Sequence, residues 1–566
     1  MPNLPTSLRA AALTLTLLLL TGCAAGGGTQ AVPPYARLVA DLQAERSTAW
    51  DQLDRAFLRL PDFQDRLERL GVLHSNIGAV PDGDVDTLER SAEEMLGLYY
   101  GDLRAHQLRH RLALAADEAE TAAFHGAAAD AIEAAIAASG DGSMDAPYAV
   151  ISAPQAFAWL EKRRTEVVGA LYTTDDDLPQ LLLVAKVRRT EGRALQELRF
   201  DLTPTFKAST ALTGAVGEGA RPSQVVAARA VQGDSAAQAA YAITLWQQGP
   251  EYGGRAVQWL QSASESGNLI AREMLGVIYG SLASGRSGEE AQRLLDAAVD
   301  QFLLAVNQGS DTAMYNLAQL YLSGHFGEEN QPAGVALMEQ AAERDNLDAL
   351  VMLARLHYNG QFVARDRDRA VELLARASAR GHTEAQLFHA RHMLSTDDGS
   401  GFDAQALAWL EEAATRGGST EAMVLLGTLH AQGEHAALDL PAAKDWFARA
   451  AAGTDDAETI NSIAWIFAVA EKQALRDPQA ALALMDALMT ADPDAATNPA
   501  YIDTWAACYA VNGRFEDAVA VQTRAVEIAE AEAEAAEDGE APAYLPVLRE
   551  HLDLFRAGGT VTEDVP

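Results

Sequence analysis

One small-residue signature recurs six times between Gly233 and Gly433, and it limits the fold more than any other feature of this sequence. Each copy opens with glycine, once with aspartate, followed by alanine four residues later and a second small residue five residues after that. The copies start at Gly233, Gly267, Gly309, Asp345, Gly381 and Gly418. Their spacings of 34, 42, 36, 36 and 37 residues predict stacked supersecondary units, none of which buries its apolar face alone.

The copy that opens at Asp345 shows what one unit contains. Apolar residues from Ala349 to Leu356 follow helical spacing, residues 358–360 interrupt them, and a second stripe runs from Ala370 to Ala377. This pattern predicts two amphipathic helices joined by a glycine turn. The small residues let neighbouring helix backbones approach closely. We therefore expect a mostly α protein built as an α-solenoid of helix–turn–helix repeats.

Two further residue classes recur in step with the signature. Glycines at Gly324, Gly360 and Gly433 are placed to end first helices in the left-handed conformation. Large apolar residues recur on the second helices, where we expect them to fill the core: Trp259, Met338, Leu373, Trp409 and Trp446.

From Arg221 to Gly453 these residues resemble the Sel-one-like repeat family, a relative of the tetratricopeptide repeat. The run Ala422–Gly427 is typical of it. Two units depart from the pattern, because Thr396 replaces a turn glycine and residues 281–290 are an insertion. The resemblance implies a scaffold that binds other proteins rather than an enzyme.

Beyond the Sel-one-like repeats, assigned to residues 223–456, the sequence resembles tetratricopeptide repeats over residues 457–530. Trp505, Tyr509 and Gly513 stand at the spacing of that repeat. The remaining residues, 531–566, form an acidic tail with a possible capping helix.

The first 33 residues predict a lipoprotein address. Residues 1–22 form a leader in which Arg9 precedes an apolar run. This run is too short to cross a bilayer. The leader ends at Cys23 in a sequence that resembles a bacterial lipobox, and residues 23–33 make a flexible tether. We expect lipidation of Cys23 and a membrane anchor facing the periplasm, the outer membrane being favoured over the inner. A plain secretory signal is the alternative. The other cysteine, Cys508, is expected in the core.

The segment before the repeats has two parts. Residues 34–139 have helical patterns, which predict one helix over Leu38–Leu60 and another that begins at Asp86 with a capping box to Glu89. Residues 145–205 predict a small α+β element with an antiparallel meander, and residues 206–222 a linker. No family resemblance accompanies this segment.

Charge limits the partners. The formal net charge of −37 argues against nucleic acid, because phosphate binding requires a basic stripe. The two dense basic clusters are residues 162–164 and the set Lys186, Arg188 and Arg189. They could dock an acidic partner, even this chain's own tail, but protection of a sheet edge is the favoured interpretation.

Metal and catalytic patterns are weak. Asp82, Asp84, Asp86 and Glu93 have the spacing of a calcium loop, but Thr87 stands where the loop needs glycine, so a helix start is favoured. We expect His106 and His110 on a solvated helix face, without a third ligand. A second histidine group likewise lacks a ligand frame and comprises His382, His389 and His392. No catalytic residue, metal or cofactor is assigned.

The sequence therefore predicts a lipid-anchored scaffold of the cell envelope that binds proteins or peptides in a solenoid groove. Exposed first-helix residues Asn316, Gln319 and Arg355 are the candidate groove residues. Two alternatives stay open: a cell-wall or β-lactam hydrolase with its chemistry in the N-terminal half, and a structural stalk.

Overall fold

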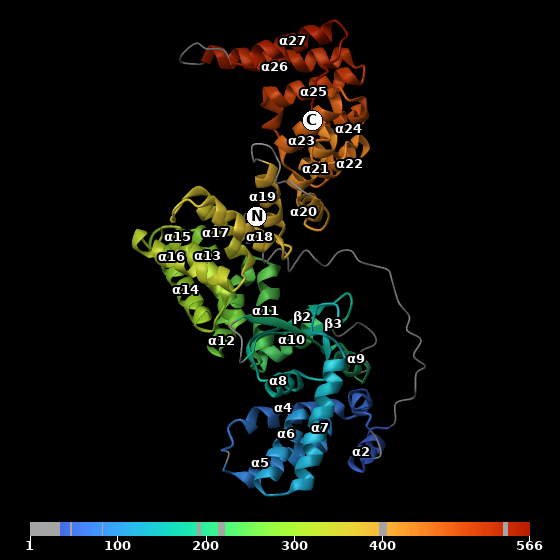
Figure 1. Cartoon of the computed structure of the whole chain (residues 1–566), viewed down its shortest axis with the longest axis vertical. Helices are drawn as coiled ribbons and strands as arrows, with labels where there is room; N and C mark the ends of the chain where they lie inside the picture. Colours follow the sequence, from blue (N-terminus) through green and yellow to red (C-terminus); the bar gives the residue numbers. More distant parts are fainter. Residues whose placement is uncertain are drawn as a thin grey trace. The chain divides into compact units, whose positions relative to one another are not determined.

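The computed structural model describes residues 34–45, 48–81, 83–189, 194–212, 221–394, 404–535 and 542–565. The predicted leader and tether, with Cys23, lie outside these residues. The chain forms two compact units that divide between Asn346 and Leu347 (Figure 1). Each unit is described by itself.

Short helices open the first unit. They are α2 Tyr35–Gln43, η1 Trp50–Gln52, α3 Leu53–Phe57, α4 Phe63–Ile77, α5 Val85–Leu98, α6 Leu103–Ala115 and α7 Ala119–Ala138. The single helix predicted over Leu38–Leu60 is wrong. Leu38 and Leu42 form one stripe and Leu53 and Phe57 another, and the chain turns between them so that both stripes face one core.

The second predicted helix also needs correction. Asp84, rather than Asp86, caps α5, its Oδ1 accepting from the Thr87 amide at 3.2 Å. The apolar pattern beyond Leu98 belongs to a separate helix, α6, because Asp102 accepts from the Ala105 amide at 2.8 Å and starts a new helix there.

A four-stranded sheet follows, as the sequence indicates. Its elements are β1 Tyr148–Ala149, α8 Ala153–Lys162, β2 Thr165–Asp175, β3 Gln180–Arg189 and β4 Leu195–Asp201. The strand order is β1-β4-β3-β2, in which β2, β3 and β4 form the predicted antiparallel meander and β1 pairs parallel with β4. Residues 206–222, predicted as a linker, contain the end of α9 Thr203–Leu212 and the start of α10 Pro222–Val231.

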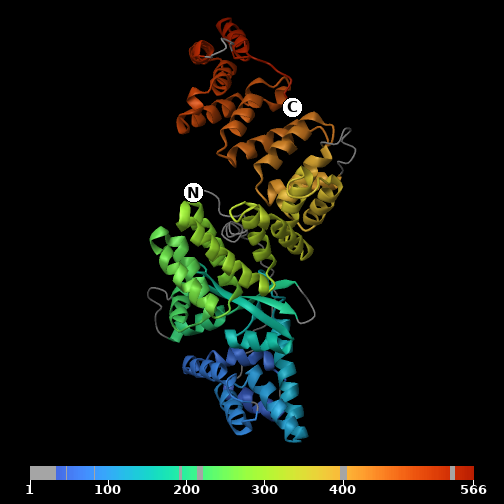
Figure 2. The ribbon, with the colours of Figure 1, turned by 90° about the vertical axis from the view of Figure 1, so that its left-hand side faces the viewer.

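Paired helices make up the rest of the first unit, which Figure 2 shows beside the sheet. They are α11 Ser235–Gln248, η2 Pro250–Tyr252, α12 Gly253–Glu265, α13 Leu269–Ser284, α14 Gly288–Asn307, α15 Asp311–Leu322, η3 Glu328–Asn330 and α16 Gln331–Glu343. In each pair the first helix packs on the second, as the repeat pattern predicts.

The second unit continues the same architecture. Its helices are α17 Leu347–Asn359, α18 Arg367–Ser378, α19 Thr383–Leu394, α20 Ala404–Thr415, α21 Thr420–Gln432, α22 Leu440–Ala452, α23 Ala457–Val469, η4 Gln473–Leu475, α24 Pro478–Ala491, η5 Ala495–Thr497, α25 Pro499–Val511, α26 Phe515–Ala535 and α27 Leu545–Arg556. The helix expected in the acidic tail is α27, which packs on α26.

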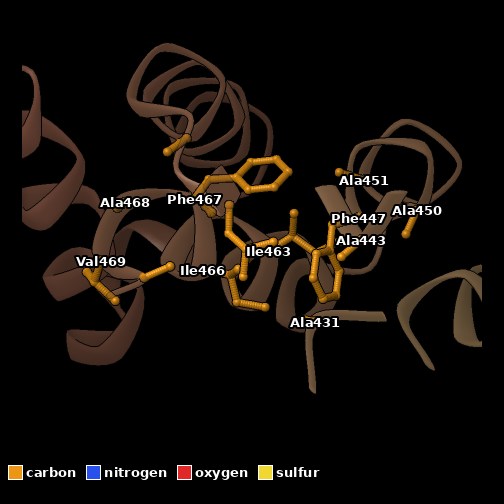
Figure 3. Close-up of a cluster of buried hydrophobic side chains, with 14 of the residues drawn as sticks. Ala431, Ala443, Phe447, Ala450, Ala451, Ile463, Ile466, Phe467, Ala468 and Val469 are labelled. Atoms are coloured by element: carbon orange, nitrogen blue, oxygen red, sulfur yellow. The ribbon is translucent and has the colours of Figure 1, made fainter. Parts of the chain in front are cut away.

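The small-residue signature is where first and second helices meet. Its alanines and glycines on the first helices are all buried. A Cβ on Gly276 would lie 2.4 Å from the Phe302 ring, and one on Gly427 would lie 2.7 Å from the Phe447 ring. Close approach is therefore required at these positions, as predicted. Figure 3 shows Phe447 among the buried side chains that join α22 to α23.

The turn residues have the backbone conformation that the sequence indicates. Gly324, Gly360 and Gly433 are left-handed, with φ of 83°, 71° and 76°. Asp345, the one start that is not glycine, also has positive φ, at 63°. Aspartate tolerates this conformation better than most residues do.

The recurring tryptophans do not fill the core as predicted, because the core position lies one residue further along the chain. Met338 and Leu373 are fully buried, whereas Trp259, Trp409 and Trp446 are only half-buried. The residues that follow these tryptophans fill the core instead: Leu260, Leu410 and Phe447. Cys508 is buried as expected, and burial raises the pKa of its thiol.

Candidate functional site: the first-helix face of the repeats

One face of the first helices carries a repeating set of side chains. We define the first-helix face by the residues three, seven and ten positions after each repeat start. In the second unit the seventh position holds half-buried apolar residues on α17, α19 and α21: Met352, Phe388 and Leu425. On either side of them, the third position holds a carboxylate on all three helices, and the tenth holds arginine on α17 and α19 but Thr428 on α21.

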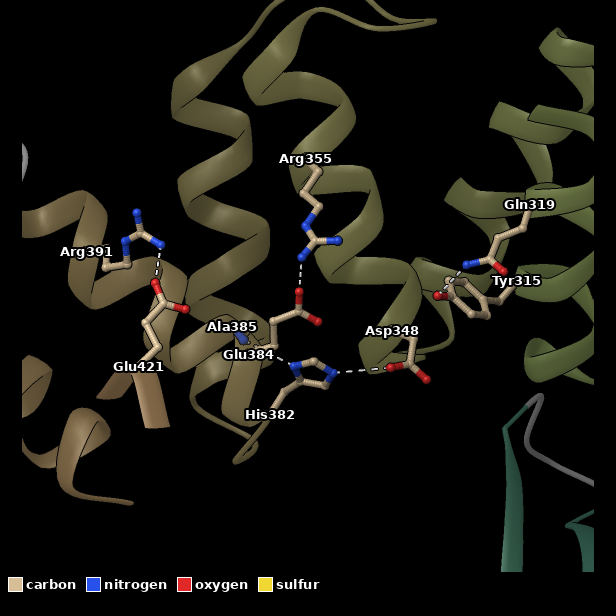
Figure 4. Close-up of polar contacts among 9 residues, drawn as sticks. All are labelled: Tyr315, Gln319, Asp348, Arg355, His382, Glu384, Ala385, Arg391 and Glu421. Carbon is tan, nitrogen blue, oxygen red and sulfur yellow. Dashed lines mark hydrogen bonds and ion pairs between the residues drawn. The ribbon is translucent and has the colours of Figure 1, made fainter. Parts of the chain in front are cut away.

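Ion pairs join adjacent first helices across this face. Arg355 on α17 pairs with Glu384 on α19, and Arg391 on α19 pairs with Glu421 on α21. Figure 4 shows both pairs. The arginine side chains are 44% and 61% exposed and their glutamates 49% and 54%. Solvent screens such pairs, so each contributes little to stability and its groups stay available to a ligand.

A polar joint lies beside these pairs at the start of α19. The Ala385 amide donates to Nδ1 of His382 at 3.2 Å, and Nε2 of His382 lies 3.2 Å from Oδ1 of Asp348. Nε2 therefore carries the proton and donates to the carboxylate. His382 thus connects two repeats, whereas His389 is buried beside Trp409 and His392 lies against Tyr358.

The three candidate groove residues all belong to this face but fall in different units. Arg355 is exposed and ion-paired, as described. In the first unit, α15 carries Asn316 at the seventh position and Gln319 at the tenth, both half-buried. Nε2 of Gln319 donates to the Tyr315 hydroxyl at 2.6 Å.

In the first unit, strand β2 covers the same face of the first two repeats. β2 contacts α11 and α13, and Val168 packs against Leu269 and Phe302. Nδ2 of Asn268, just before α13, donates to the Ala170 carbonyl at 2.7 Å. A Cβ on Gly169 would lie 3.0 Å from the Ile270 amide nitrogen, so strand and helix backbones nearly touch. The chain's own sheet therefore lies on the N-terminal part of this face in the first two repeats.

Polar contacts near the C-terminal end of β2 strengthen this junction. The Tyr172 hydroxyl lies 3.0 Å from Oδ2 of Asp234, the residue that caps α11, and accepts from Nη1 of Arg229 at 2.9 Å. Burial raises the pKa of Tyr172, so its hydroxyl stays protonated and donates to Asp234.

The basic cluster on β3 has a partner that the sequence did not identify. Nζ of Lys186 lies 2.8 Å from Oε1 of Glu273 on α13, and the Ser310 hydroxyl donates to the same carboxylate oxygen at 2.5 Å. The Lys186 and Glu273 side chains are only 11% and 12% exposed. Burial lowers the pKa of Lys186, but the Glu273 carboxylate more than offsets it and leaves that pKa raised.

Sheet-edge protection is therefore the wrong interpretation of Lys186, because β3 is an inner strand and its lysine reaches the repeats. Arg188 on the same strand donates from Nη1 to the Gln308 carbonyl at 2.9 Å. The acidic partner of this cluster is the solenoid itself. No signal in the sequence joins Lys186 to a residue 87 positions away.

The other basic cluster borders a cleft of about 810 Å³ between α8 and the sheet. Lys162 pairs with Asp130 at 2.6 Å, and the Arg163 guanidinium lies 4.6 Å from the centre of the Trp159 ring. The Lys162–Asp130 pair holds α8 to α7. The cleft wall mixes both charge signs, with Asp141 and Glu197 beside the arginines, and so specifies no ligand class.

The N-terminal histidines are not on a solvated face, which corrects that prediction. His106 is fully buried, its Nε2 2.9 Å from the Tyr100 carbonyl and its Nδ1 2.9 Å from Nδ1 of His125. Nε2 therefore donates to the carbonyl and Nδ1 accepts from His125. Nδ1 of His110 forms a hydrogen bond with the Ala122 carbonyl. Within the described residues no group of three or more metal-ligating side chains occurs.

The calcium-like segment is a helix start in this structure. Asp84 caps α5, and Glu89 pairs with Arg109 on α6. Asp82 lies outside the described residues.

Comparison with known proteins identifies the repeats. A family model described as Sel1 repeat matches residues 236–268, 311–346, 347–382, 403–418 and 420–455. The chain carries Sel1 repeats. The stretches left unmatched, 269–310 and 383–402, are those where the sequence has its insertion and its missing turn glycine. The structure nevertheless forms the pair α13 and α14 within the first stretch, and α19 of the second stretch pairs with α20, which lies in the next matched segment. Sel1 repeats typically mediate protein–protein interaction.

Several solved structures are similar to this chain. A Sel1 repeat protein from Oxalobacter formigenes has 20% identity, with 54% of this chain and 86% of that chain covered and a TM-score of 0.35. A protective antigen of uropathogenic Escherichia coli with this repeat fold has 17% identity, coverage of 82% and 97%, and a TM-score of 0.34. The immunity protein PA5088 from Pseudomonas aeruginosa has 19% identity, coverage of 39% and 83%, and a TM-score of 0.26. No curated protein matches. Among the described helices, none combines the length and apolar character needed to cross a membrane.

Proposed function

We propose that this chain is a lipid-anchored adaptor of the cell envelope whose Sel1 repeats bind an extended segment of a partner protein. The binding surface is the first-helix face of α17, α19 and α21. One observation carries the proposal: the same position on three successive helices presents a half-buried apolar residue, which on α17 and α19 lies between a carboxylate and an exposed arginine.

The chemistry of this face suits a peptide backbone with alternating side chains. Phe388 lies at its centre, its ring 5.5 Å from that of Tyr358 in an edge-to-face arrangement. Aromatic residues at the centre of a surface, surrounded by polar groups that exclude water, commonly contribute most of the binding energy. Arg355 and Arg391 can exchange their glutamate partners for carboxylates or carbonyls of a ligand at small cost, because both pairs are exposed.

The first unit supports the choice of an extended ligand. Its own β2 lies on the equivalent face of α11 and α13, where the Asn268 side chain donates to its backbone and Val168 packs in the core. The face of a Sel1 repeat in this chain is therefore compatible with an extended segment.

Site-specific photocrosslinking tests the proposal in cells. A photoreactive residue replaces Phe388, and a matched control carries it at Glu411, an exposed position on the second helix α20. We expect a discrete crosslinked partner from position 388 and none from position 411. Equal labelling of the same proteins from both positions would contradict the proposal and favour a stalk.

The anchor is a separate part of the proposal and rests on the leader and Cys23. Several acyl chains bind a membrane firmly, whereas a single chain binds only marginally. Metabolic labelling with a radioactive fatty acid should mark the chain, and Cys23→Ser should abolish the label and release the protein from the outer-membrane fraction. Label that persists in Cys23→Ser would rule out this site of attachment.

A further inference from the structure

In the first unit, β2 lies on the repeats as an extended segment. A second contact of this kind occurs in the second unit, where residues 558–565 follow α27 and pack against the solenoid. We call these residues the closing segment. The site that receives it, the α23–α24 notch, consists of Trp465, residues 469–472 and Arg476. It is separate from the first-helix face of α17, α19 and α21.

Backbone pairing holds the closing segment in the manner of an added strand. The Glu563 amide donates to the Val469 carbonyl at 3.0 Å, and the Glu471 amide donates to the Glu563 carbonyl at 2.7 Å. The result is a parallel bridge between Ala470 and Glu563. Such pairing supplies affinity without regard to sequence.

Side chains add a sequence preference. Val561 is buried in the core cluster, and Val565 packs at its edge. Between them, Oε2 of Glu563 accepts from the Trp465 indole at 3.0 Å. These three residues alternate along the segment, as the residues on one side of a strand do.

The intervening residues meet the cations of the notch. Nη2 of Arg476 donates to the Thr562 hydroxyl at 3.0 Å, and Nζ of Lys472 lies 3.8 Å from Asp564. Arg476 also donates from Nε to the Ala470 carbonyl at 2.6 Å, which fixes the backbone that pairs with the segment. Arg476 and Lys472 thus present two positive charges to an acidic segment, although the chain as a whole has a net charge of −37.

We infer that the α23–α24 notch is a binding site for acidic, extended peptides of partner proteins, and that the closing segment occupies it in cis. A ligand would present apolar residues two positions to either side of a glutamate, as Val561, Glu563 and Val565 do. A short covalent connection gives the closing segment a millimolar effective concentration, so a free peptide competes poorly until that segment is displaced.

The test uses the full chain and a dye-labelled synthetic peptide of residues 557–565, with binding measured by fluorescence anisotropy. Glu563→Pro in the chain removes the amide that pairs with Val469 and should release the segment. We expect this variant to bind the peptide at least about tenfold more tightly than the native chain does. The matched control, Glu550→Gln at an exposed position of α27, should bind like the native chain.

Two further measurements fix the location. Arg476→Gln in the Glu563→Pro background should weaken the peptide several-fold, and a peptide with proline at the Glu563 position should not bind. Should Glu563→Pro fail to fold, Thr562→Ala with Asp564→Ala changes only side chains of the segment and should give a smaller gain. Equal peptide affinity for the native chain and the folded released variant, or binding insensitive to Arg476→Gln, would overturn the inference. Neither result would bear on the first-helix face.

Discussion

The same repeat presents its first-helix face in two states. On α11 and α13 the face is covered by β2, and the seventh position of the first repeat is Ala240, buried against the sheet. On α17, α19 and α21 no strand among the described residues of the second unit lies on the face, and on this open face that position holds Met352, Phe388 and Leu425. The small-residue core behind the face is alike in both. The helix pairs therefore fold by one set of rules, whether or not a strand lies on the face.

The largest predicted effect comes from breaking the buried contact that holds the sheet to the repeats. Glu273→Leu leaves the Lys186 ammonium buried without its carboxylate partner, and such changes cost about 3–5 kcal/mol. In urea denaturation followed by circular dichroism, we expect the transition of the first unit to move to lower urea.

The control for this prediction replaces both partners. Lys186→Met with Glu273→Leu removes the unpaired charge, so most of the lost stability should return. If the double variant is as unstable as Glu273→Leu alone, the loss comes from packing at α13 and not from the ion pair.

The next prediction tests the part that the two regions share. Gly276→Ala in the first unit and Gly427→Ala in the second each place a methyl group less than 3 Å from a buried phenylalanine ring. Overpacking of this kind costs about 1–3 kcal/mol, and we expect similar losses at both sites. Gly280→Ala is the control, since its added Cβ meets nothing within 4 Å. A large loss at only one of the two sites would mean that the helix pairs are not equivalent.

The sequence predicted what is local and periodic. Glycines and alanines at fixed spacing predicted the helix pairs, and alternation predicted the meander of β2, β3 and β4. Contacts between distant residues leave no such pattern, so the junction of Lys186 with Glu273 and the meeting of His106 with His125 were not predicted. The tryptophans were placed one residue out of register, because a half-buried indole and a buried leucine next to it both fit an amphipathic stripe.

Protonation should affect the two units in opposite directions. In the first unit, burial lowers the pKa of His106 and His125 to about 4. Their ordinary value is about 6.5, so the stability of this pair is complete above that pH and is lost as the pH falls toward 4. Because His125 is half-exposed and His106 is fully buried, we expect His106 to contribute the larger share of this loss.

In the second unit, His551 lies 2.9 Å from the buried Asp503 carboxylate. Burial lowers the pKa of His551, but hydrogen bonding to Asp503 outweighs this and leaves it raised. The contact with Asp503 stabilises the second unit at pH values below the ordinary pKa of histidine. This stabilisation is lost as the pH rises through the raised pKa of His551. Hydrogen exchange, corrected for intrinsic rates at each pH, should show α6 and α7 gaining protection from pH 5 to 8 while α25 and α27 lose it. His551→Gln should remove only the second trend, and parallel trends in both units would contradict the assignment.

The smallest stability effect belongs to the open face, and it separates binding from folding. Arg355→Ala and Arg391→Ala remove exposed ion pairs, so each should change the free energy of unfolding by less than about 1 kcal/mol. Arg416→Ala is the matched control, because Arg416, just after α20, pairs with Glu412 of that helix and not with a residue of this face. We expect crosslinking from position 388 to fall in the first two variants and to persist in the third. A change of several kcal/mol in Arg355→Ala would mean that these pairs hold the repeats together as Lys186 and Glu273 hold the sheet, and the face would then be a structural joint rather than a site for a partner.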